Sequence, residues 1–397
     1  MNNKKRGYKM KILIVGAGIA GLTLADQLDR EGYSVQIIEK APGLRTEGYM
    51  MDFFGAGYDV AEKMGLLKEL EKIHYPIEAL KVKRADGTTK YSLNYQSLRQ
   101  LLNDRHFNFM RGDLERVLYE RIKDRVPVTY STTIESLQQD EEGILVELSN
   151  ETKLNCDLLV GADGIHSKVR KLVFGEEENY VHSMGYQTVA FTFDKTSKYN
   201  KTDHTFDTIT EPGRQVSIYP IMGNRIAAFF LFSNKDGSLK HHSHEEGIKE
   251  LKKHFGDMGW VVPDILQESE KVTDFYFDDV AQTEMTTWTK GRVALVGDAC
   301  GCVSLVAGQG SSLAMAGAYS LARCLGESKS NIKGALAEYN ALMVPQVTKI
   351  QKSARKFASF FFPESKWKLM IRDITMRASV MPIIRNFMKF KSIRVPK

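Results

Sequence analysis

Short apolar runs alternate with glycine-rich turns along the chain, and the first such junction predicts a specific local structure. Residues 11–15 form an apolar, β-rich run. They lead directly into Gly16-Ala17-Gly18-Ile19-Ala20-Gly21, after which apolar residues recur at helical spacing at Leu22, Ala25 and Leu28. The pattern predicts a strand, a tight turn and a helix, followed by a second strand over residues 34–38.

The residue types at this turn favour a bound dinucleotide, FAD or NAD, over a purely structural glycine turn. Gly16 permits the turn, Gly18 lets a pyrophosphate approach the backbone, and Gly21 lets the helix pack on the strand. The free N–H groups of the helix N-terminus face the phosphates. An acid after the second strand accepts hydrogen bonds from the ribose and disfavours NADP in this pocket. The predicted cofactor residues of this segment are Gly16, Gly18, Ala20, Gly21, Glu39 and Lys40.

Two further apolar runs end in polar glycine turns. Residues 156–164 predict a strand that ends in Asp163-Gly164, and residues 165–170 open a helix in which His166 is interpreted as a solvated side chain. Residues 291–299 predict a strand that ends in Gly297-Asp298, and the later turn 308–310 precedes a helix with a small-residue face. Taken alone, each motif is as consistent with a buried strand followed by an ordinary turn as with a functional site.

Together the three motifs, in this order, resemble the class A flavoprotein monooxygenases, the family of para-hydroxybenzoate hydroxylase. The resemblance covers all but the C-terminal part of the chain and implies FAD as cofactor. It places the DG motif near the pyrophosphate and the path of the nicotinamide donor, the GD aspartate at the ribityl chain, and the GQG turn at the pyrimidine end of the flavin. An arginine opening an R-x-x-L-x-x-x-L helix lies over the FAD. The residues implied are Asp163, Gly164, Gly297, Asp298, Gly308, Gln309, Gly310 and Arg111.

The third motif departs from the family pattern. The family reads GDAAH with a proline a few residues before GQG, whereas here Gly301 replaces the histidine and Leu305 or its neighbour replaces the proline. That proline lies near the oxygen-reacting carbon of the flavin, so we expect Leu305 near the flavin and the oxygen chemistry altered in efficiency or type. Cys300 and Cys302 are interpreted as packing residues, with redox or metal-binding roles as the alternative.

Between Met184 and Asp279 the pattern changes to β-rich runs joined by polar turns. Strands are predicted over residues 188–193, 214–219 and 225–232, and residues 78–94 are expected to join the same sheet. We expect this sheet to cover the flavin and bind the substrate. Aromatic residues in strands are more often core; the candidate pocket residues are Tyr186, Phe191, Phe193 and Tyr219. Residues 274–278 with Trp288 resemble the tetracycline-inactivating branch of the family.

The predicted fold class is α/β: a Rossmann-like FAD-binding domain carrying the GxGxxG, DG and GD motifs, an inserted, mainly antiparallel β substrate domain, and a C-terminal helical segment. The predicted FAD-binding domain is discontinuous and comprises residues 1–75, 100–183 and 285–335. Residues 76–99 and 184–284 form the predicted substrate domain, and residues 336–397 the C-terminal helices.

Composition narrows the range of partners. The net charge is +6, with basic and acidic residues interleaved along most of the 397-residue chain, which argues against nucleic-acid binding. Four cysteines without a C-x-x-C pair argue against a disulfide framework or zinc site and indicate a reducing, cytoplasmic setting. The basic and apolar N-terminus is better explained by the first strand than by a secretory signal.

The segment from Lys366 to Lys397 differs, because it carries nine Lys or Arg against the single acid Asp373. Its apolar residues run from Leu369 through Met370 and Ile374 to Val380 and beyond, with Pro382 expected to break or kink the helix. A basic amphipathic helix can lie on an anionic membrane. We favour a helix whose apolar stripe packs against the protein.

The function predicted from these observations is FAD-dependent monooxygenation of a phenolic or polycyclic aromatic small molecule, with tetracycline-like antibiotics and quinones as candidate substrates. NADPH or NADH is the expected transient electron donor, since there is no second GxGxxG, and O₂ the co-substrate, reacting through a flavin C4a-hydroperoxide. No side chain is required as a covalent catalyst and no metal is expected. A flavin-dependent reductase or halogenase, or an FAD-containing protein that sequesters an aromatic ligand, are the alternatives.

Overall fold

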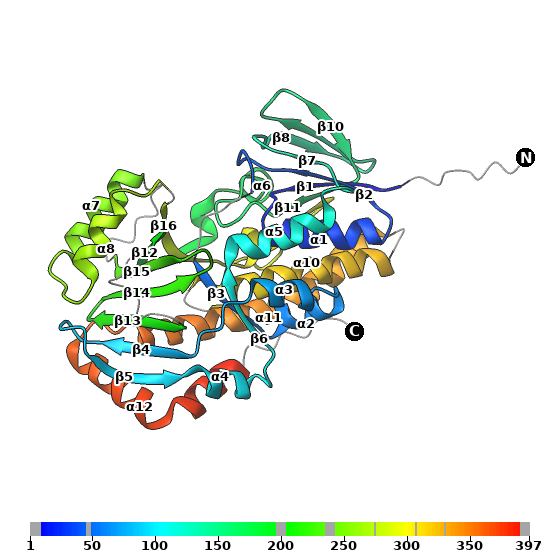
Figure 1. Ribbon diagram of the computed structural model, residues 1–397. Coiled ribbons are helices and arrows are strands. Elements are labelled where there is room, and N and C mark those ends of the chain that lie inside the picture. The colour runs from blue at the N-terminus through cyan, green and yellow to red at the C-terminus, as the bar shows by residue number, and fades with distance from the viewer. Residues whose placement is uncertain are drawn as a thin grey trace, which may run out of the picture.

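The computed structural model describes residues 9–44, 49–195, 204–234, 243–273, 275–305, 308–328 and 331–389, with the backbone alone for residues 97, 98, 101 and 378–389. Two sheets dominate the chain (Figure 1). One is a parallel sheet packed with helices, and the other is a larger, mainly antiparallel sheet. The arrangement confirms the predicted α/β class with an inserted β region and C-terminal helices.

The first sheet has the strand order β17-β18-β11-β1-β2-β7 and is parallel except for the edge strand β17. Its strands are buried almost throughout, as expected of a parallel sheet covered by helices. Their bounds are β1 (Lys11–Val15), β2 (Ser34–Ile38), β7 (Val128–Thr129), β11 (Leu158–Gly161), β17 (Thr289–Lys290) and β18 (Val293–Leu295). The carboxyl ends of β1, β11 and β18 therefore lie side by side, and each carries one of the three predicted motifs.

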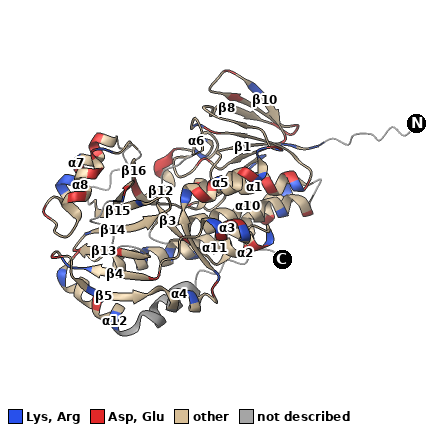
Figure 2. Ribbon diagram, in the orientation of Figure 1, with Lys and Arg blue, Asp and Glu red and all other residues tan. Residues whose placement is uncertain are grey.

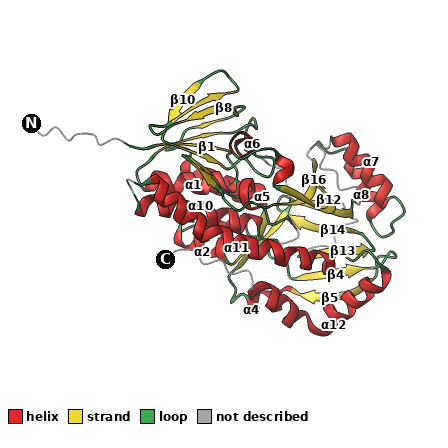
Figure 3. Cartoon of the chain, turned by 180° about the vertical axis from the view of Figure 1, so that it is seen from behind, coloured by secondary structure: helices red, strands yellow, loops and turns green. Residues whose placement is uncertain are grey.

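Helices α1 (Ile19–Arg30), α5 (Arg111–Ile122) and α10 (Gly310–Glu327) pack together beside this sheet (Figures 1 and 3). A small antiparallel sheet of β8 (Ile134–Gln139), β9 (Ile144–Leu148) and β10 (Lys153–Cys156) flanks it, next to α6 (Lys168–Val173). Two short helices complete the region: the 3₁₀ helix Glu177–Asn179 and α9 (Asp298–Gly301).

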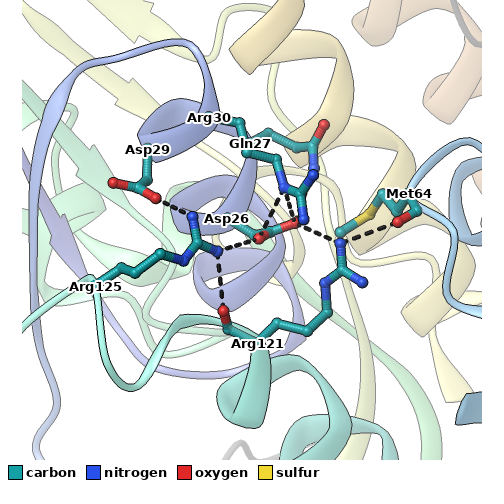
Figure 4. A network of polar contacts seen from close by, with 7 residues as sticks. All are labelled: Asp26, Gln27, Asp29, Arg30, Met64, Arg121 and Arg125. Carbon is teal, nitrogen blue, oxygen red and sulfur yellow. Dashed lines mark hydrogen bonds and ion pairs between the residues drawn. The ribbon is translucent and has the colours of Figure 1, made fainter.

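A buried carboxylate fixes α1 against α5 (Figure 4). Asp26 of α1 is fully buried, and its Oδ1 accepts hydrogen bonds from Arg125 at 2.8 Å and Arg30 at 3.1 Å. Its Oδ2 pairs with Arg121 at 3.3 Å, and Arg121 also donates to the Met64 carbonyl at 3.0 Å. A buried charge is tolerated only when it is paired in this way. The cluster holds in fixed register the two helices whose N-termini face the cavity described below.

The second sheet has the order β16-β12-β15-β14-β13-β4-β5, and its neighbouring strands are antiparallel except for β13 with β4. The predicted strands and the joining of residues 78–94 are confirmed. The bounds are β4 (Ala79–Lys83), β5 (Thr89–Asn94), β12 (Val181–Asp194), β13 (Thr205–Glu211), β14 (Arg214–Ile221), β15 (Arg225–Ser233) and β16 (Phe275–Thr283).

Side chains alternate between the two faces of this sheet. On one face Phe191, Phe193, Phe230 and Phe232 form a core with α7 (His244–Phe255) and α8 (Val262–Ser269). The opposite face points toward the parallel-sheet region. Lys, Arg, Asp and Glu are mixed on the outer surfaces of α7 and α8 (Figure 2), as expected of amphipathic helices over a sheet.

A two-stranded sheet of β3 (Met50–Phe54) and β6 (His106–Met110) connects the two regions. Near it lie α2 (Ala56–Lys63), α3 (Leu67–Ile73) and α4 (Tyr95–Leu101). The long helix α11 (Ile332–Phe361) runs behind both regions (Figure 3), and α12 (Lys366–Lys389) follows it.

The expectation for the apolar stripe of α12 is wrong for Met370 and Ile374, which are exposed, as are Trp367 and Ile371. The helix contacts β5 through polar residues: Asp373 accepts from the Tyr91 hydroxyl at 3.0 Å and pairs with Lys90, and buried Arg372 donates to the Phe361 carbonyl. Among the described apolar side chains of the helix, Leu369 is half-buried and Met376 is buried. The expected apolar residues from Val380 onward lie outside the described side chains. None of the described helices is both long and apolar enough to cross a membrane.

Candidate active site

The glycine turn after β1 separates two kinds of glycine. Gly16 has φ +111°, and a Cβ there would lie 2.4 Å from the Ala162 carbonyl oxygen. A Cβ on Gly21 would lie 2.0 Å from the Gly16 oxygen, so both positions are fixed by internal packing. A Cβ on Gly18 would meet nothing nearer than Glu115 Oε1 at 3.8 Å. Gly18 therefore borders open space, as a pyrophosphate cradle requires.

Glu39 is buried at the end of β2 and holds this turn. Its Oε2 accepts from the Ala17 N–H at 2.7 Å and its Oε1 from the Ala41 N–H at 2.8 Å. A small cavity of about 80 Å³ adjoins it and is lined by residues of the first two motif regions and by Arg111, including Gly16, Gly18, Glu39, Lys40, Asp163 and Gly164. Each carboxylate oxygen can accept a further hydrogen bond. Ala20 instead packs against Gly297: a Cβ atom added to Gly297 would lie 2.9 Å from the Ala20 Cβ. Ala20 lines neither this cavity nor the larger one.

Asp163 of the DG motif organises its own turn. Its Oδ1 accepts from the Ser167 hydroxyl at 2.5 Å and its Oδ2 from the Val169 N–H at 3.1 Å, which stabilises the start of α6. Burial raises the pKa of this carboxyl, against the opposing hydrogen bond from Ser167. Gly164 has φ +81° with no atom near a Cβ position, so its backbone is open to the cavities that both residues line.

Arg111 and Asp298 face each other across the larger cavity, which measures about 570 Å³. Arg111 is the first residue of α5 and pairs with Glu115 at 3.2 Å. Burial lowers the pKa of Arg111, but Glu115, followed by Tyr49 and Asp298, raises it above its ordinary value. Asp298 opens α9 after Gly297, whose φ is +68°. Burial raises the pKa of Asp298, and Arg111 opposes that rise. Arg111 lines both cavities and Asp298 only the larger one, and the two side chains are close enough to influence each other's pKa.

The turn before α10 presents polar atoms without protein partners. Gly308, Gln309 and Gly310 line the larger cavity, with Ser304 and Leu305 beside them. Gln309 Oε1 and Ser304 Oγ are both buried and have no hydrogen-bond partner. Buried polar atoms are almost always satisfied, so unsatisfied ones beside a cavity indicate a ligand. Ser304, at φ +78°, holds a strained left-handed conformation. Leu305 accepts from the Gly308 N–H at 2.9 Å and so closes the turn.

Of the four predicted substrate residues, the structure places one in the larger cavity. Tyr219 lines it. Phe191 and Phe193 do not, because their odd-numbered positions on β12 point to the α7 and α8 face, whereas Thr188 points to the cavity. Tyr186 shares the face of Thr188, but it packs against Phe362, and its hydroxyl donates to the carbonyl of that residue.

Sequence reasoning missed several polar and aromatic lining residues. Tyr49, Asp52, Tyr95, Phe206 and Phe229 lie outside the three motifs, and Tyr276 and Asp278 belong to residues 274–278, to which no place in the pocket was assigned. Strand register gives the only signal for some of them: Thr188 pairs across to Leu231 and Asp278, which share its face. Nothing in the periodicity of residues 49–52 indicated a cavity.

His166 is not a solvated helix residue. It lines the larger cavity between Glu177, 2.9 Å from its Nδ1, and Asp278, 3.7 Å from its Nε2. The carboxylates of Asp278, the larger cause, and Glu177 raise the pKa of His166 to about 9 against opposing burial. The side chain is therefore an imidazolium at neutral pH.

Cys300 and Cys302 are buried, and burial raises the pKa of both thiols well above the usual range. A buried, protonated thiol is unreactive. Over the described part of the chain, no group of three His, Cys, Asp or Glu side chains is arranged to hold a metal ion.

These residues fit FAD. The open side of Gly18 faces the small cavity, and the unpartnered Gln309 and Ser304 atoms and the N-terminus of α10 at Gly310 face the larger one. The two cavities share the lining residues Lys40, Arg111, Asp163 and Gly164. N–H groups at helix N-termini bind phosphates and anionic ring edges. Ligand pockets typically measure a few hundred to about 1,000 Å³, and the larger cavity lies within that range.

Comparisons with known proteins agree with this geometry. Residues 9–350 match the FAD binding domain family. A flavin-dependent monooxygenase of Legionella longbeachae is 32% identical over 344 residues, covering 86% of this chain and 87% of that protein. The tetracycline destructase Tet(55) has a crystal structure that matches with a TM-score of 0.84 at 29% identity, covering 98% of this chain and 99% of that one.

Klebsiella pneumoniae HpxO, solved with FAD and uric acid, shares the fold at a TM-score of 0.80 and 21% identity, over 99% of this chain and 98% of that one. The family match spans all three motifs and most of both sheets. The chain therefore belongs to the FAD-binding-domain family of class A flavoprotein monooxygenases and is an FAD-dependent oxidoreductase of that family.

Proposed function

We propose that this enzyme hydroxylates a planar phenolic or polycyclic aromatic molecule, using O₂ and a transiently bound NADPH or NADH. One observation carries the proposal: one cavity of about 570 Å³ is lined both by residues of the DG, GD and GQG turns and by aromatic residues of the second sheet. A cofactor and a ligand can therefore meet inside the protein. The similarity to tetracycline destructases favours large, oxygen-rich ring systems as substrates.

The walls of the cavity suit a flat ligand. Tyr219 and Phe206 stack with ring centroids 5.0 Å apart and planes 11° apart, and the Tyr219 hydroxyl accepts from the Met50 N–H at 2.8 Å. Tyr49 packs edge-on against Phe229 at 6.1 Å. Rigid aromatic walls bind planar rings by dispersion and offset stacking.

Bound FAD supplies hydride acceptance and oxygen activation, and the protein supplies position and electrostatics. We assign the pyrophosphate to the open side of Gly18, the ribose to Glu39, and the ribityl chain to Asp298. Gln309 Oε1, Ser304 Oγ and the N-terminus of α10 would bind the ring edge. Arg111 would offset the negative charge that the ring gains on reduction.

We assign FAD binding and substrate binding to different segments of the chain. Residues 1–75, 100–183 and 285–335 would bind FAD, residues 76–99 and 184–284 would bind the substrate, and residues 336–397 would form the C-terminal helices. Tyr49 to Asp52 cross this division, since they line the cavity beside the second sheet.

The test is to load the purified protein with FAD and record oxidation of NADPH and NADH with a panel of phenols, quinones and tetracyclines, together with the mass of each product. The proposal expects at least one compound to accelerate oxidation and to gain one oxygen atom. A reductase or halogenase would oxidise NAD(P)H without that product, and a sequestering protein would bind the compound with no acceleration. Either result across the whole panel would reject hydroxylation.

A further inference from the structure

We propose that Asp52 forms a subsite that binds a cationic or hydrogen-bond-donating group of the substrate and excludes aromatic carboxylates. This inference rests on the proposed function, because it names the class of substrate for the same cavity. It concerns a side chain that belongs to none of the three motifs.

Asp52 is placed by strand register. In the antiparallel pair β3 and β6, Asp52 lies directly opposite Asn108, and His106 lies two residues further along β6 on the same face. Asn108 Nδ2 donates to Asp52 Oδ1 at 2.6 Å, and His106 Nε2 donates to the same oxygen at 3.0 Å. Because a carboxylate only accepts, Nε2 carries the proton of the imidazole ring. The Tyr95 hydroxyl is hydrogen-bonded to Asp52 as well.

Two of the three donors are buried behind the cavity wall, Tyr95 lines the cavity, and the Asp52 carboxylate borders it. His106 and Asn108 are 4% and 2% exposed, whereas the side chain of Asp52 is 39% exposed and lines the cavity. Three donors from two elements fix the orientation of the carboxylate, so little entropy is lost when a ligand binds to it.

The basic residues of the cavity are elsewhere. Among its described lining residues, the basic side chains are Lys40, Arg111 and His166. Lys40 and Arg111 also line the small cavity at the glycine turn, and His166 is paired with Glu177 and Asp278.

The cavity wall that Asp52 shares is largely apolar and aromatic. It includes Met50, Met51, Leu80, Tyr95, Phe206 and Tyr219.

This arrangement selects ligands by charge. Arg99 lies near Tyr95 but donates to the Ile77 carbonyl and does not line the cavity. A substrate carboxylate inside the cavity would therefore meet the Asp52 carboxylate and be repelled by it. An ammonium, amide N–H or phenolic O–H would instead gain a charge-assisted hydrogen bond. The substrate class is therefore a planar aromatic molecule bearing such a donor. The alternative is that Asp52 only ties β3 to β6, in which case ligand charge would not matter.

The test uses three probes with one ring system: 2-naphthylmethylamine, 2-naphthol and 2-naphthoate. Calorimetry on the FAD-loaded protein gives a Kd for each without requiring turnover. We expect the amine to bind at least about ten-fold more tightly than the carboxylate, a factor typical of one charge-assisted contact. Asp52→Asn should reduce that ratio to about three or less, since it removes the charge and keeps the side-chain shape.

Asp59→Asn is the matched control, because Asp59 pairs with Arg105 and does not line the cavity. It should keep the full ratio. Equal binding of amine and carboxylate by the unmodified protein would overturn the subsite even if Asp52→Asn does not fold, and so would an unchanged ratio in a folded Asp52→Asn variant. If the ratio behaves as expected but no compound of the earlier panel is hydroxylated, the subsite stands and the proposed function fails.

Discussion

At one end of the cavity, Asp163 and Asp298 each follow a parallel strand, as does Gly16 of the adjoining small cavity, and local sequence determines the turn that each forms. At the other end, Tyr219, Phe229 and Asp52 come from strands of two different sheets and meet only through their register. The first end depends on turns that only glycine or a short acid can form. The second depends on which face a side chain occupies, and a shift of one residue would replace the whole set.

The largest expected effect is at the first end. Gly18→Val should abolish FAD retention while the apoprotein still folds, because the new side chain enters the open space beside the turn rather than the core. Flavin absorbance after gel filtration and the thermal unfolding of the apoprotein are the two readouts. Gly21→Ala is the matched control: its Cβ would meet the Gly16 oxygen at 2.0 Å, so it should impair folding itself. A Gly18→Val protein that keeps its flavin would show that the cradle is assigned wrongly.

The second end is tested by two aromatic residues on opposite faces of the sheet. Phe191→Ala should lower the free energy of unfolding by about 3 to 5 kcal/mol, the usual cost of removing a core phenylalanine, and leave the Kd of the naphthalene probes unchanged. Tyr219→Leu should weaken probe binding, since that ring lines the cavity. Denaturant unfolding and calorimetry separate the effects. If Phe191→Ala altered probe binding as strongly as Tyr219→Leu, the distinction between faces would be lost.

Asp298→Ala is expected to weaken FAD binding by about 1 to 3 kcal/mol, the cost of leaving a buried hydrogen-bonding partner unsatisfied. Its neighbour Arg111 would also lose an opposing charge. Titration of the apoprotein with FAD, followed by flavin fluorescence, gives the affinity. An unchanged Kd would remove Asp298 from the cofactor site.

A smaller effect should appear in the pH dependence of stability. The pKa of His166 is about 9 in the folded protein, against about 6.5 for a free histidine. Its stabilising contribution is therefore complete below about pH 6.5 and is lost as the pH rises through about 9. Thermal unfolding midpoints across this range should fall, and His166→Gln should flatten the decline.

His254→Gln serves as the control for that measurement. Burial lowers the pKa of His254, so this residue does not contribute to the loss of stability at alkaline pH. The decline in the unfolding midpoint should therefore persist in the His254→Gln protein. A decline of the same size in the His166→Gln protein would contradict the pairing of His166 with Asp278 and Glu177.

The smallest effect concerns Leu305, which closes the turn beside the unpartnered Ser304 hydroxyl. We expect some NAD(P)H oxidation to yield hydrogen peroxide rather than product, because this backbone lacks the fixed φ that proline would impose. Leu305→Pro should change the ratio of NAD(P)H oxidised to product formed. One-to-one coupling in the unmodified enzyme would contradict this expectation.

The comparison also explains what the sequence could predict. Strand, turn and helix around Gly16, Asp163 and Asp298 are local, so the parallel sheet and the turns at its carboxyl edge followed from the motifs. The strands of the second sheet were also predictable from their β-rich runs. Which of their aromatics face the cavity was not, because Phe191 and Tyr219 look alike until pairing fixes the face of each.

Two other failures have similar causes. His166 looked solvated because Asp278 is far away in sequence and reaches it only in the folded chain. The apolar residues of α12 looked like a core stripe, but Arg372 and Asp373 occupy the packed face instead. In both cases the residue that determines the environment of the side chain lies more than 100 residues away in sequence, so the local sequence pattern does not indicate the contact.

The central claim is that one cavity joins an FAD site to an aromatic substrate site, and oxygen transfer tests it most directly. FAD-loaded protein should be given NADPH, isotopically labelled dioxygen and the compound that most accelerates NADPH oxidation, and the product examined by mass spectrometry. The account predicts a product that carries one labelled oxygen atom, with none formed by the Gly18→Val protein. NADPH oxidation that yields only hydrogen peroxide, with the compound recovered unchanged, would contradict it.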